Sequence, residues 1–199
     1  MKAATYALLL LTAYLVGSIP FSLIFGKLFK GLDVRKVGSG NVGATNTLIT
    51  AGKRAGILAV TFDVAKGVSI FFLAELLTKN ELMILLASIL VVLGHVFPIY
   101  LNFKGGKGLA TMTGVFIAIN PYVIWVILSL YFLFLIITRY LILSSLLVLA
   151  LLPFIFLFLN DGPYAFFFAL SVFVIALYAH RRDLEKLISG QEKKLFDVI

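Results

Sequence analysis

The sequence contains no cysteine, and only 13% of its 199 residues are charged. The absence of cysteine excludes a disulfide framework, a thiolate metal site and a cysteine nucleophile. The low charge is not typical of a soluble domain, in which about a quarter of the residues are charged. Apolar residues make up 62% of the chain, and the mean hydropathy is +1.11. Because one core of this size cannot bury so much apolar surface, the composition predicts an integral membrane protein.

Long apolar runs predict an all-α, polytopic membrane protein with seven transmembrane helices, folded as a single domain over residues 1–199. A helix needs about 20 apolar residues to cross a bilayer. The first run is too long for a signal peptide and no cleavage site follows it, so we expect a retained helix. The fourth run is the weakest, because it is short and the turn signal Asn120-Pro121 follows it. The expected spans are residues 4–26, 55–77, 82–101, 109–120, 121–138, 141–159 and 162–180.

The net charge of +8 is distributed unevenly along the chain. Seven spans place three polar segments on one side of the membrane, together with Arg139: residues 27–54, 102–108 and 181–199. That side carries 14 of the 17 basic residues, and the other three are Lys2, Lys66 and Lys79. Because basic residues favour the cytoplasmic side, we expect the N-terminus outside and the C-terminus in the cytoplasm. The basic balance then requires no nucleic-acid partner.

The first polar segment contains the glycine-rich sequence GSGNVGATN, at residues 38–46. Its glycines are Gly38, Gly40 and Gly43. Glycine permits left-handed backbone and close approach of the backbone to a ligand. Successive N–H groups of such a backbone can bind an anion. Side-chain donors are added by Ser39, Thr45 and Asn46. The segment lacks the ending of a Walker A loop and the strand that precedes a dinucleotide site, and a plain flexible loop is the alternative.

The second polar segment places two lysines around glycines. Lys104 and Lys107 flank Gly105 and Gly106, and Gly108 follows. Lysine charges and exposed backbone amides suit a phosphate group, and a helix that begins at Gly108 would add its N-terminal dipole. The alternative is a tight turn whose lysines only mark the cytoplasmic side.

Polar residues also occur inside the predicted spans. Asp63 and Lys66 are three residues apart on one helix face, so they can form a structural ion pair that lowers the cost of charge in the bilayer. A proton relay is the alternative. His95, in an apolar helix, is expected to be a hydrogen-bonded structural residue. His180, at the boundary of the last span, is the better catalytic candidate. An amphipathic stretch follows it, and Arg181 suits contact with lipid headgroups.

The motifs of several common enzyme classes are missing from the sequence. It has no Gly-x-Ser-x-Gly nucleophile motif and no cluster of histidine and carboxylate residues, so we expect neither a metal nor another cofactor. The polar residues are suited to holding anions beside lipid. They favour an enzyme that acts on a phosphorylated small molecule and a lipid.

Three motifs resemble those of the bacterial membrane acyl-phosphate:glycerol-3-phosphate acyltransferase family. They are GSGNVGATN at residues 38–46, GHVFPIYLNFKGGKGLAT at 94–111, and HRRD with GQE within 180–192. Asp63, Lys66 and Gly67 resemble a further segment of that family, so the resemblance spans nearly the whole chain. It implies seven helices, an external N-terminus, and a multi-pass protein of the cell (inner) membrane with its active site facing the cytoplasm.

The resemblance also implies a reaction in phospholipid synthesis. An acyl group passes from acyl phosphate to the 1-hydroxyl of sn-glycerol 3-phosphate, giving lysophosphatidate and phosphate. Because acyl phosphate is already activated, the enzyme needs no covalent nucleophile, CoA or metal. The catalytic positions implied are Ser39, Asn46, Lys104 and His180. The substrate-binding positions implied are Gly38, Gly40, Asn41, Gly43, Gly105, Gly106, Lys107, Gly108 and Glu192. The implied partners are the two substrates, membrane lipid and the enzyme that produces acyl phosphate.

Three positions depart from the family pattern. Ile49 stands where an arginine is usual, Asp183 where an asparagine is usual, and Ile142 where a serine is expected. Loss of an arginine and gain of a carboxylate should weaken the binding of a dianion. The alternatives are therefore a divergent paralogue that binds lipid or glycerol phosphate without catalysis, and a transporter of a phosphorylated metabolite.

Overall fold

The computed structural model describes residues 2–192 and 194, and its regular elements there are helices only. The all-α prediction is confirmed. Contacts group the chain into two compact units, residues 1–118 and 119–199, and the single domain stays a prediction. Lys193, one of the basic residues of the C-terminal segment, lies outside the described residues.

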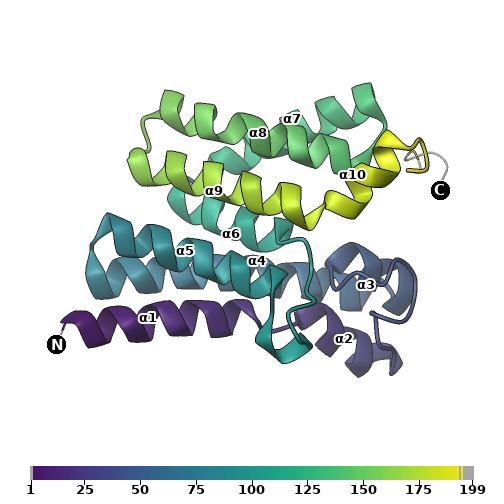
Figure 1. The fold of residues 1–199 in the computed structure, drawn as a ribbon, viewed down its shortest axis with the longest axis horizontal. Helices are drawn as coiled ribbons and strands as arrows, with labels where there is room; N and C mark the ends of the chain where they lie inside the picture. The colour runs from purple at the N-terminus through teal and green to yellow at the C-terminus, as the bar shows by residue number, and fades with distance from the viewer. Residues whose placement is uncertain (1, 193, 195–199) are drawn as a thin grey trace. The chain divides into compact units, whose positions relative to one another are not determined.

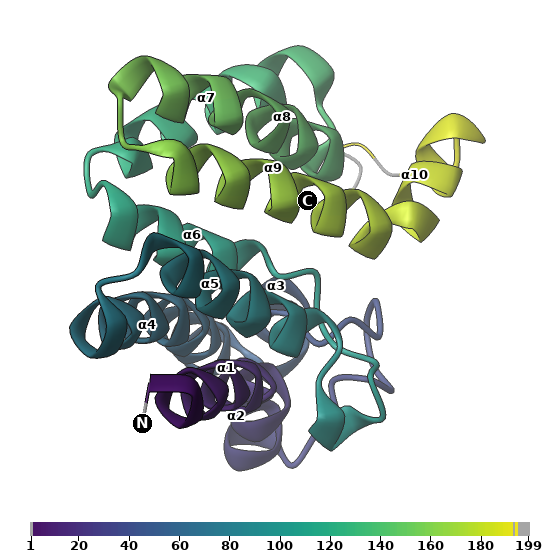
Figure 2. The same ribbon diagram turned by 60° about the vertical axis from the view of Figure 1, so that its left-hand side comes forward.

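The first unit is built around three long helices, α1 (Lys2–Gly17), α4 (Lys53–Thr78) and α5 (Glu81–Val96). These helices lie side by side in both ribbon views (Figures 1 and 2). Shorter elements complete the unit: α2 (Phe21–Lys30), α3 (Ala44–Ala51), a 3₁₀ turn at Ile99–Leu101 and α6 (Leu109–Ile119).

The expected first span, residues 4–26, is broken in the structure and continues to Lys30. Proline lacks an N–H group and disfavours helical backbone in the residue before it. The chain accordingly leaves the helix between α1 and α2, and Pro20 directly precedes α2. The break frees backbone carbonyls at depth in the first unit, where they need polar partners.

Glycines let the helices of the first unit pack closely. A Cβ atom at Gly94 would lie 2.3 Å from the carbonyl oxygen of Tyr14, and one at Gly67 would lie 2.3 Å from that of Thr111. Small residues at such crossings are typical of membrane helices, which associate through close packing. They bring α5 against α1 and α6 against α4.

Part of the glycine-rich segment at residues 38–46 is helical in the structure. The last three residues of that segment form the first turn of α3, which begins after Gly43. The hydroxyl of Thr47 donates to the Gly43 carbonyl at 3.0 Å, and Leu48 packs against Gly56 of α4. A helix of eight residues is too short to give a clear periodic signal, which is why the sequence did not indicate it.

The second unit is a group of three apolar helices and a short terminal one. They are α7 (Val123–Thr138), α8 (Leu141–Leu159), α9 (Pro163–Ala179) and α10 (Arg181–Ile188). The amide of Asn120 donates to both oxygens of Asp161, at 3.1 and 3.0 Å, and joins the start of α7 to the α8–α9 connection. The chain bends by 63° between α9 and α10.

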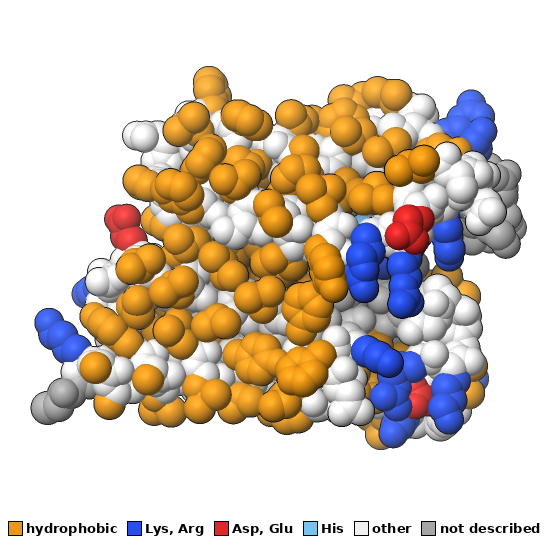
Figure 3. Space-filling view, viewed as in Figure 1, with side chains coloured by type: hydrophobic (Ala, Val, Ile, Leu, Met, Phe, Trp, Pro, Cys, Tyr) orange, Lys and Arg blue, Asp and Glu red, His pale blue; other side chains and the backbone are white. Residues whose placement is uncertain are grey.

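Several helices are long and apolar enough to cross a membrane. Within the described residues four segments qualify by length and composition: Lys2–Lys30, Lys53–Thr78, Glu81–Leu101 and Leu141–Leu159. The bent pair of α9 and α10 would be a fifth, and α6 and α7 are shorter apolar helices. On the face seen in Figure 3, hydrophobic side chains cover the long helices of the first unit, and many basic ones gather over α2 and the segment before α3. The membrane prediction is confirmed in this coarser form.

Candidate active site

The side chain of Asn46, in the first turn of α3, holds the first glycine-rich loop, residues 38–43. Its amide nitrogen donates to the carbonyls of Val34, Val37 and Asn41 at 2.8, 3.2 and 3.1 Å, and its oxygen accepts from the Ser39 amide at 3.0 Å. Asn46 is only 4% exposed. Both ends of its side chain are therefore engaged in holding the loop, and the catalytic role that the family resemblance implies for Asn46 stays a prediction.

The loop also uses its own backbone donors. Gly40 donates to the Val37 carbonyl at 3.1 Å, and the Asn41 amide lies 3.4 Å from the Ser39 hydroxyl. Gly38 and Gly40 have left-handed backbone, with φ of 59° and 72°, which favours glycine at both. At Gly38 a Cβ atom would also lie 2.3 Å from Oδ1 of Asn46. An anion bound by the predicted N–H groups must compete with these internal bonds.

The arginine just before this loop is already paired. The Arg35 guanidinium donates to the Asp33 carboxylate, with a closest distance of 2.6 Å, and this holds the pKa of Asp33 well below its usual range. The pair neutralises Arg35 locally.

The second loop, residues 102–108, is held by a ladder of backbone bonds. Gly105 donates to the Val96 carbonyl at 3.1 Å and Gly106 to the His95 carbonyl at 3.2 Å. Lys104 is exposed and Lys107 is half-buried. Gly108 has a φ of +84° and its carbonyl accepts from Met112, so α6 begins one residue after the position considered in the sequence. The loop thus places lysines beside the start of a helix.

The two loops meet in the first unit. A Cβ atom at Gly106 would lie 2.4 Å from the carbonyl oxygen of Val42, so only glycine allows this approach. An apolar cluster of Leu23, Val34, Val42 and Leu101 joins α2, the first loop and the turn before the second loop. The structure therefore brings the two predicted anion-binding segments together.

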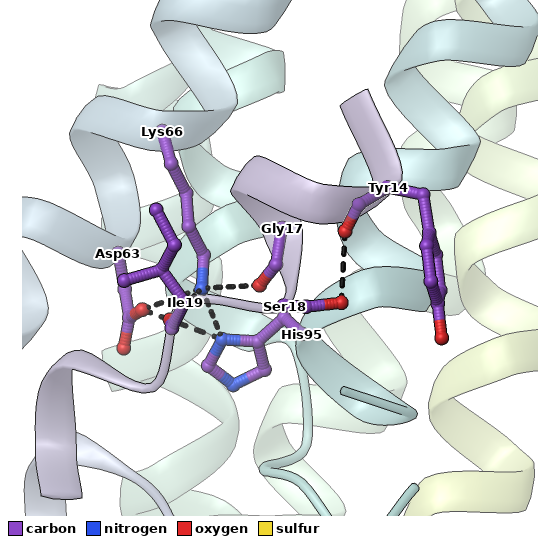
Figure 4. A network of polar contacts seen from close by, with 7 residues as sticks. All are labelled: Tyr14, Gly17, Ser18, Ile19, Asp63, Lys66 and His95. Carbon is purple, nitrogen blue, oxygen red and sulfur yellow. Dashed lines mark hydrogen bonds and ion pairs between the residues drawn. The ribbon is translucent and has the colours of Figure 1, made fainter. Parts of the chain in front are cut away.

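A buried polar network lies next to the loops (Figure 4). The ammonium of Lys66 forms the predicted ion pair with Asp63 at 2.8 Å, and it lies 2.9 Å from Nδ1 of His95. The same ammonium donates to the carbonyls of Gly17 and Ile19, at 2.9 and 3.3 Å, in the break between α1 and α2. The expectations of an ion pair and of a hydrogen-bonded His95 are confirmed. The sequence did not show that these groups share one network or that they meet the broken helix.

A small hollow is lined by residues of both the network and the loops. Its volume is about 10 Å³, which is roughly the space of one water molecule. Asp63, His95, Ser22, Val42 and Gly106 are among the residues that line it. The Ser22 hydroxyl is buried there without a hydrogen-bond partner among the described residues, so a water molecule in the hollow would have a polar side chain to bind.

His180 and Glu192 belong to the second unit. Nδ1 of His180 lies 2.8 Å from the Ala176 carbonyl. Because a carbonyl only accepts, Nδ1 carries the hydrogen, and Nε2 of a neutral ring is an acceptor. The backbone N–H of Glu192 donates to the Lys186 carbonyl near the end of α10. Both residues flank α10, and their roles toward a substrate stay predictions.

Comparison with known proteins gives one consistent result. The family model described as glycerol-3-phosphate acyltransferase matches residues 7–190. Curated proteins of that name from Macrococcus caseolyticus and Bacillus subtilis are 44% and 39% identical, and the matches cover 95% of this chain and 96% and 97% of the relatives. A crystal structure of PlsY, an integral membrane glycerol 3-phosphate acyltransferase, in its glycerol 3-phosphate form is similar with a TM-score of 0.86 and 32% identity, over 95% of this chain and 94% of the other. The lysophosphatidic acid form matches with a TM-score of 0.87 and 31% identity, over 97% of both chains.

Proposed function

The chain belongs to the glycerol-3-phosphate acyltransferase family, and we propose that it transfers an acyl group from acyl phosphate to the 1-hydroxyl of sn-glycerol 3-phosphate. The products are lysophosphatidate and phosphate. Family membership confirms the resemblance read from the three motifs, and it favours an acyltransferase over a transporter or a non-catalytic paralogue. The acyl phosphate donor, the active-site residues and the membrane orientation are parts of the proposal.

One structural observation supports the proposed reaction: the two predicted anion-binding loops meet. The glycine-rich loop at 38–43 and the lysine-bearing loop at 102–108 meet through Val42 and Gly106, next to one end of the apolar helices. Both substrates are phosphorylated, and one also carries an acyl chain. A basic, glycine-rich surface beside apolar helices suits such a pair, because the chain can stay in lipid while the phosphates bind the loops.

The chemistry needs positioning more than it needs a reactive side chain. The hydroxyl oxygen of glycerol 3-phosphate attacks the acyl carbon, the bond from that carbon to the phosphate oxygen breaks, and phosphate leaves with the electron pair. Holding two reactants in alignment can lower the barrier by about 7–11 kcal/mol. Lys104 and Lys107 offset the charge of the phosphates. The hydroxyl proton passes to a phosphate oxygen, and the accepting Nε2 of His180 orients the hydroxyl.

We further propose the full topology of seven spans with an external N-terminus and a cytoplasmic active site in the cell membrane. The boundaries of α4 to α9 lie within a few residues of the expected spans. The sequence places 14 of 17 basic residues on one side, which favours a cytoplasmic location for the loops. Cysteines introduced singly at Lys79 and Lys30 test this. In intact cells an impermeant thiol reagent should label position 79 and not position 30, and the reverse pattern would refute the orientation.

The reaction is tested with purified protein in lipid bilayers. Acyl phosphate and glycerol 3-phosphate should give lysophosphatidate and phosphate in equal amounts, with a chelator present and CoA absent. Acyl-CoA in place of acyl phosphate should give no product. A folded protein that binds glycerol 3-phosphate without turnover would support the non-catalytic paralogue. Uptake of glycerol phosphate into sealed vesicles would support the transporter.

A further inference from the structure

Lys66 makes more contacts than an ion pair requires. Asp63 alone would compensate its charge, at 2.8 Å. The ammonium nevertheless also donates to the Gly17 carbonyl at 2.9 Å and lies 2.9 Å from Nδ1 of His95. Its side chain is 2% exposed, so these contacts are shielded from water. Lys66 thus ties together three elements: α4, α5 and the break between α1 and α2.

The contact with Lys66 fixes the ring of His95. Nδ1 of His95 lies 2.9 Å from the Lys66 ammonium and 3.4 Å from Oδ1 of Asp63. Because an ammonium only donates hydrogen bonds, Nδ1 accepts from Lys66, its closer partner, when Lys66 is charged. A neutral ring then carries its hydrogen on Nε2, on the side that faces the second loop. A Cβ atom at Gly106 would lie 2.3 Å from Nε2. The ring edge is therefore in direct contact with the backbone of the loop.

The backbone of α5 holds the loop at the same place. The His95 carbonyl accepts from the Gly106 amide at 3.2 Å, and the neighbouring Val96 carbonyl accepts from Gly105 at 3.1 Å. Gly105 leaves no space either, since a Cβ atom there would lie 2.1 Å from the His95 carbonyl oxygen. Rotation of the His95 ring toward the loop would displace Gly106, and with it the path of the chain between the two lysines.

We propose that Lys66 is a positioning residue for the loop at 102–108. It orients His95, and His95 holds Gly106, which sets where Lys104 and Lys107 meet a phosphate group. Asp63 supplies the opposite charge that keeps the ammonium stable inside the protein. The part that concerns phosphate binding rests on the proposed function, whereas the part that concerns the loop backbone does not.

Two variants separate positioning from charge compensation. Lys66→Met breaks the ion pair and removes every contact of the ammonium. Asp63→Asn/Lys66→Met also removes the contacts, but it leaves no buried charge, and replacing a whole buried pair is far less costly than breaking it. We expect the double variant to recover the thermal stability that the single variant loses. We expect it not to recover the wild-type loop. Lys79→Met, at the exposed end of α4, is the control.

The readouts are kinetics and hydrogen exchange on the full chain in lipid. In the double variant KM for glycerol 3-phosphate should rise at least about tenfold, with a smaller change in kcat. A displacement of about 1 Å in a positioned group can lower the efficiency of an enzyme up to about 100-fold. Amide exchange of a peptide covering residues 102–108, measured without substrate, should also rise about tenfold, and exchange in α8 should not change. Wild-type KM and wild-type exchange in a folded double variant would overturn the proposal.

Variants of His95 test the proposal if Lys66→Met and Asp63→Asn/Lys66→Met do not fold. The amide oxygen of His95→Asn stands near the place of Nδ1 and can accept from Lys66, whereas His95→Leu cannot. Slower exchange of the 102–108 peptide in the asparagine variant than in the leucine variant supports positioning, and equal exchange in the two overturns it. If the wild type has no acyltransferase activity, the proposed function fails, and the exchange data still decide whether Lys66 positions the loop.

Discussion

His95 and His180 are held in opposite tautomers by the groups that meet their Nδ1 atoms. The Lys66 ammonium donates to His95, so Nε2 of that ring carries the hydrogen. The Ala176 carbonyl accepts from His180, so Nε2 of that neutral ring is an acceptor. Only the second arrangement can accept a hydrogen bond from a substrate hydroxyl. The hydrogen-bonded role expected of His95 is confirmed, and the catalytic role of His180 stays a prediction.

Substitutions at His180 should separate its two ring nitrogens. His180→Asn keeps a donor near the Ala176 carbonyl but loses the acceptor at Nε2. His180→Gln keeps an acceptor near Nε2 but cannot take a proton. If His180 orients the hydroxyl, kcat should fall about 100-fold in the asparagine variant. In the glutamine variant it should fall only about 10-fold. Steady-state rates at saturating substrate measure this. Equal, near-complete loss in both would instead mark His180 as the group that takes the proton.

Lys104→Ala should impair substrate binding more than folding. The side chain is exposed, so its removal should leave the unfolding temperature within a degree or two of wild type. Hydrogen bonds to charged groups contribute about 1.5–3 kcal/mol, and KM for glycerol 3-phosphate should therefore rise about 10- to 100-fold. Lys104→Arg should retain part of the affinity, and Lys79→Ala should match the wild type. An unchanged KM in Lys104→Ala would remove Lys104 from the site.

Asn46→Ala should destabilise the protein as well as inactivate it. The substitution removes four hydrogen bonds and leaves the buried Val34 carbonyl without its donor. A buried polar group without a partner costs about 1–3 kcal/mol, so we expect a loss of about 2–4 kcal/mol in unfolding free energy. Thermal unfolding in detergent measures it, with the exposed neighbour variant Thr45→Ala as the control. If Asn46→Ala keeps wild-type stability while losing activity, Asn46 acts on the substrate and not on the loop.

Ile49→Arg should strengthen the binding of glycerol 3-phosphate. Ile49 is 65% exposed on α3, directly after the glycine-rich loop, so an arginine there meets no steric barrier. An exposed charge pair contributes up to about 1 kcal/mol, equivalent to about a fivefold lower KM at low salt. The gain should shrink as salt rises, because exposed charges are screened. Ile49→Gln is the neutral control. An unchanged KM at low salt would show that this position does not face the bound phosphate.

The sequence predicted the helices better than the connections between them. Apolar runs locate α8 to the residue, because lipid-facing helices need a length that the bilayer sets. The motifs located the two loops and their lysines. The network around Lys66 was only partly predictable. The spacing of Asp63 and Lys66 indicated the ion pair, but the carbonyls of Gly17 and Ile19 are backbone groups that carry no sequence signal. Pro20 was the available clue to the break that frees them.

The backbone hydrogen bonds made by residues 103–106 have a consequence for the affinity of this loop for a ligand. Phe103, Lys104, Gly105 and Gly106 each donate a backbone N–H to a carbonyl between His95 and Leu101. Their conformational entropy is therefore lost when the protein folds and not when a ligand arrives. Rigid sites of this kind retain more of the interaction energy as affinity, because ordering a loop at binding would consume it. If the loop binds phosphate as proposed, we expect this preorganisation to favour one spacing between anionic groups and to discriminate against phosphorylated polyols of other lengths.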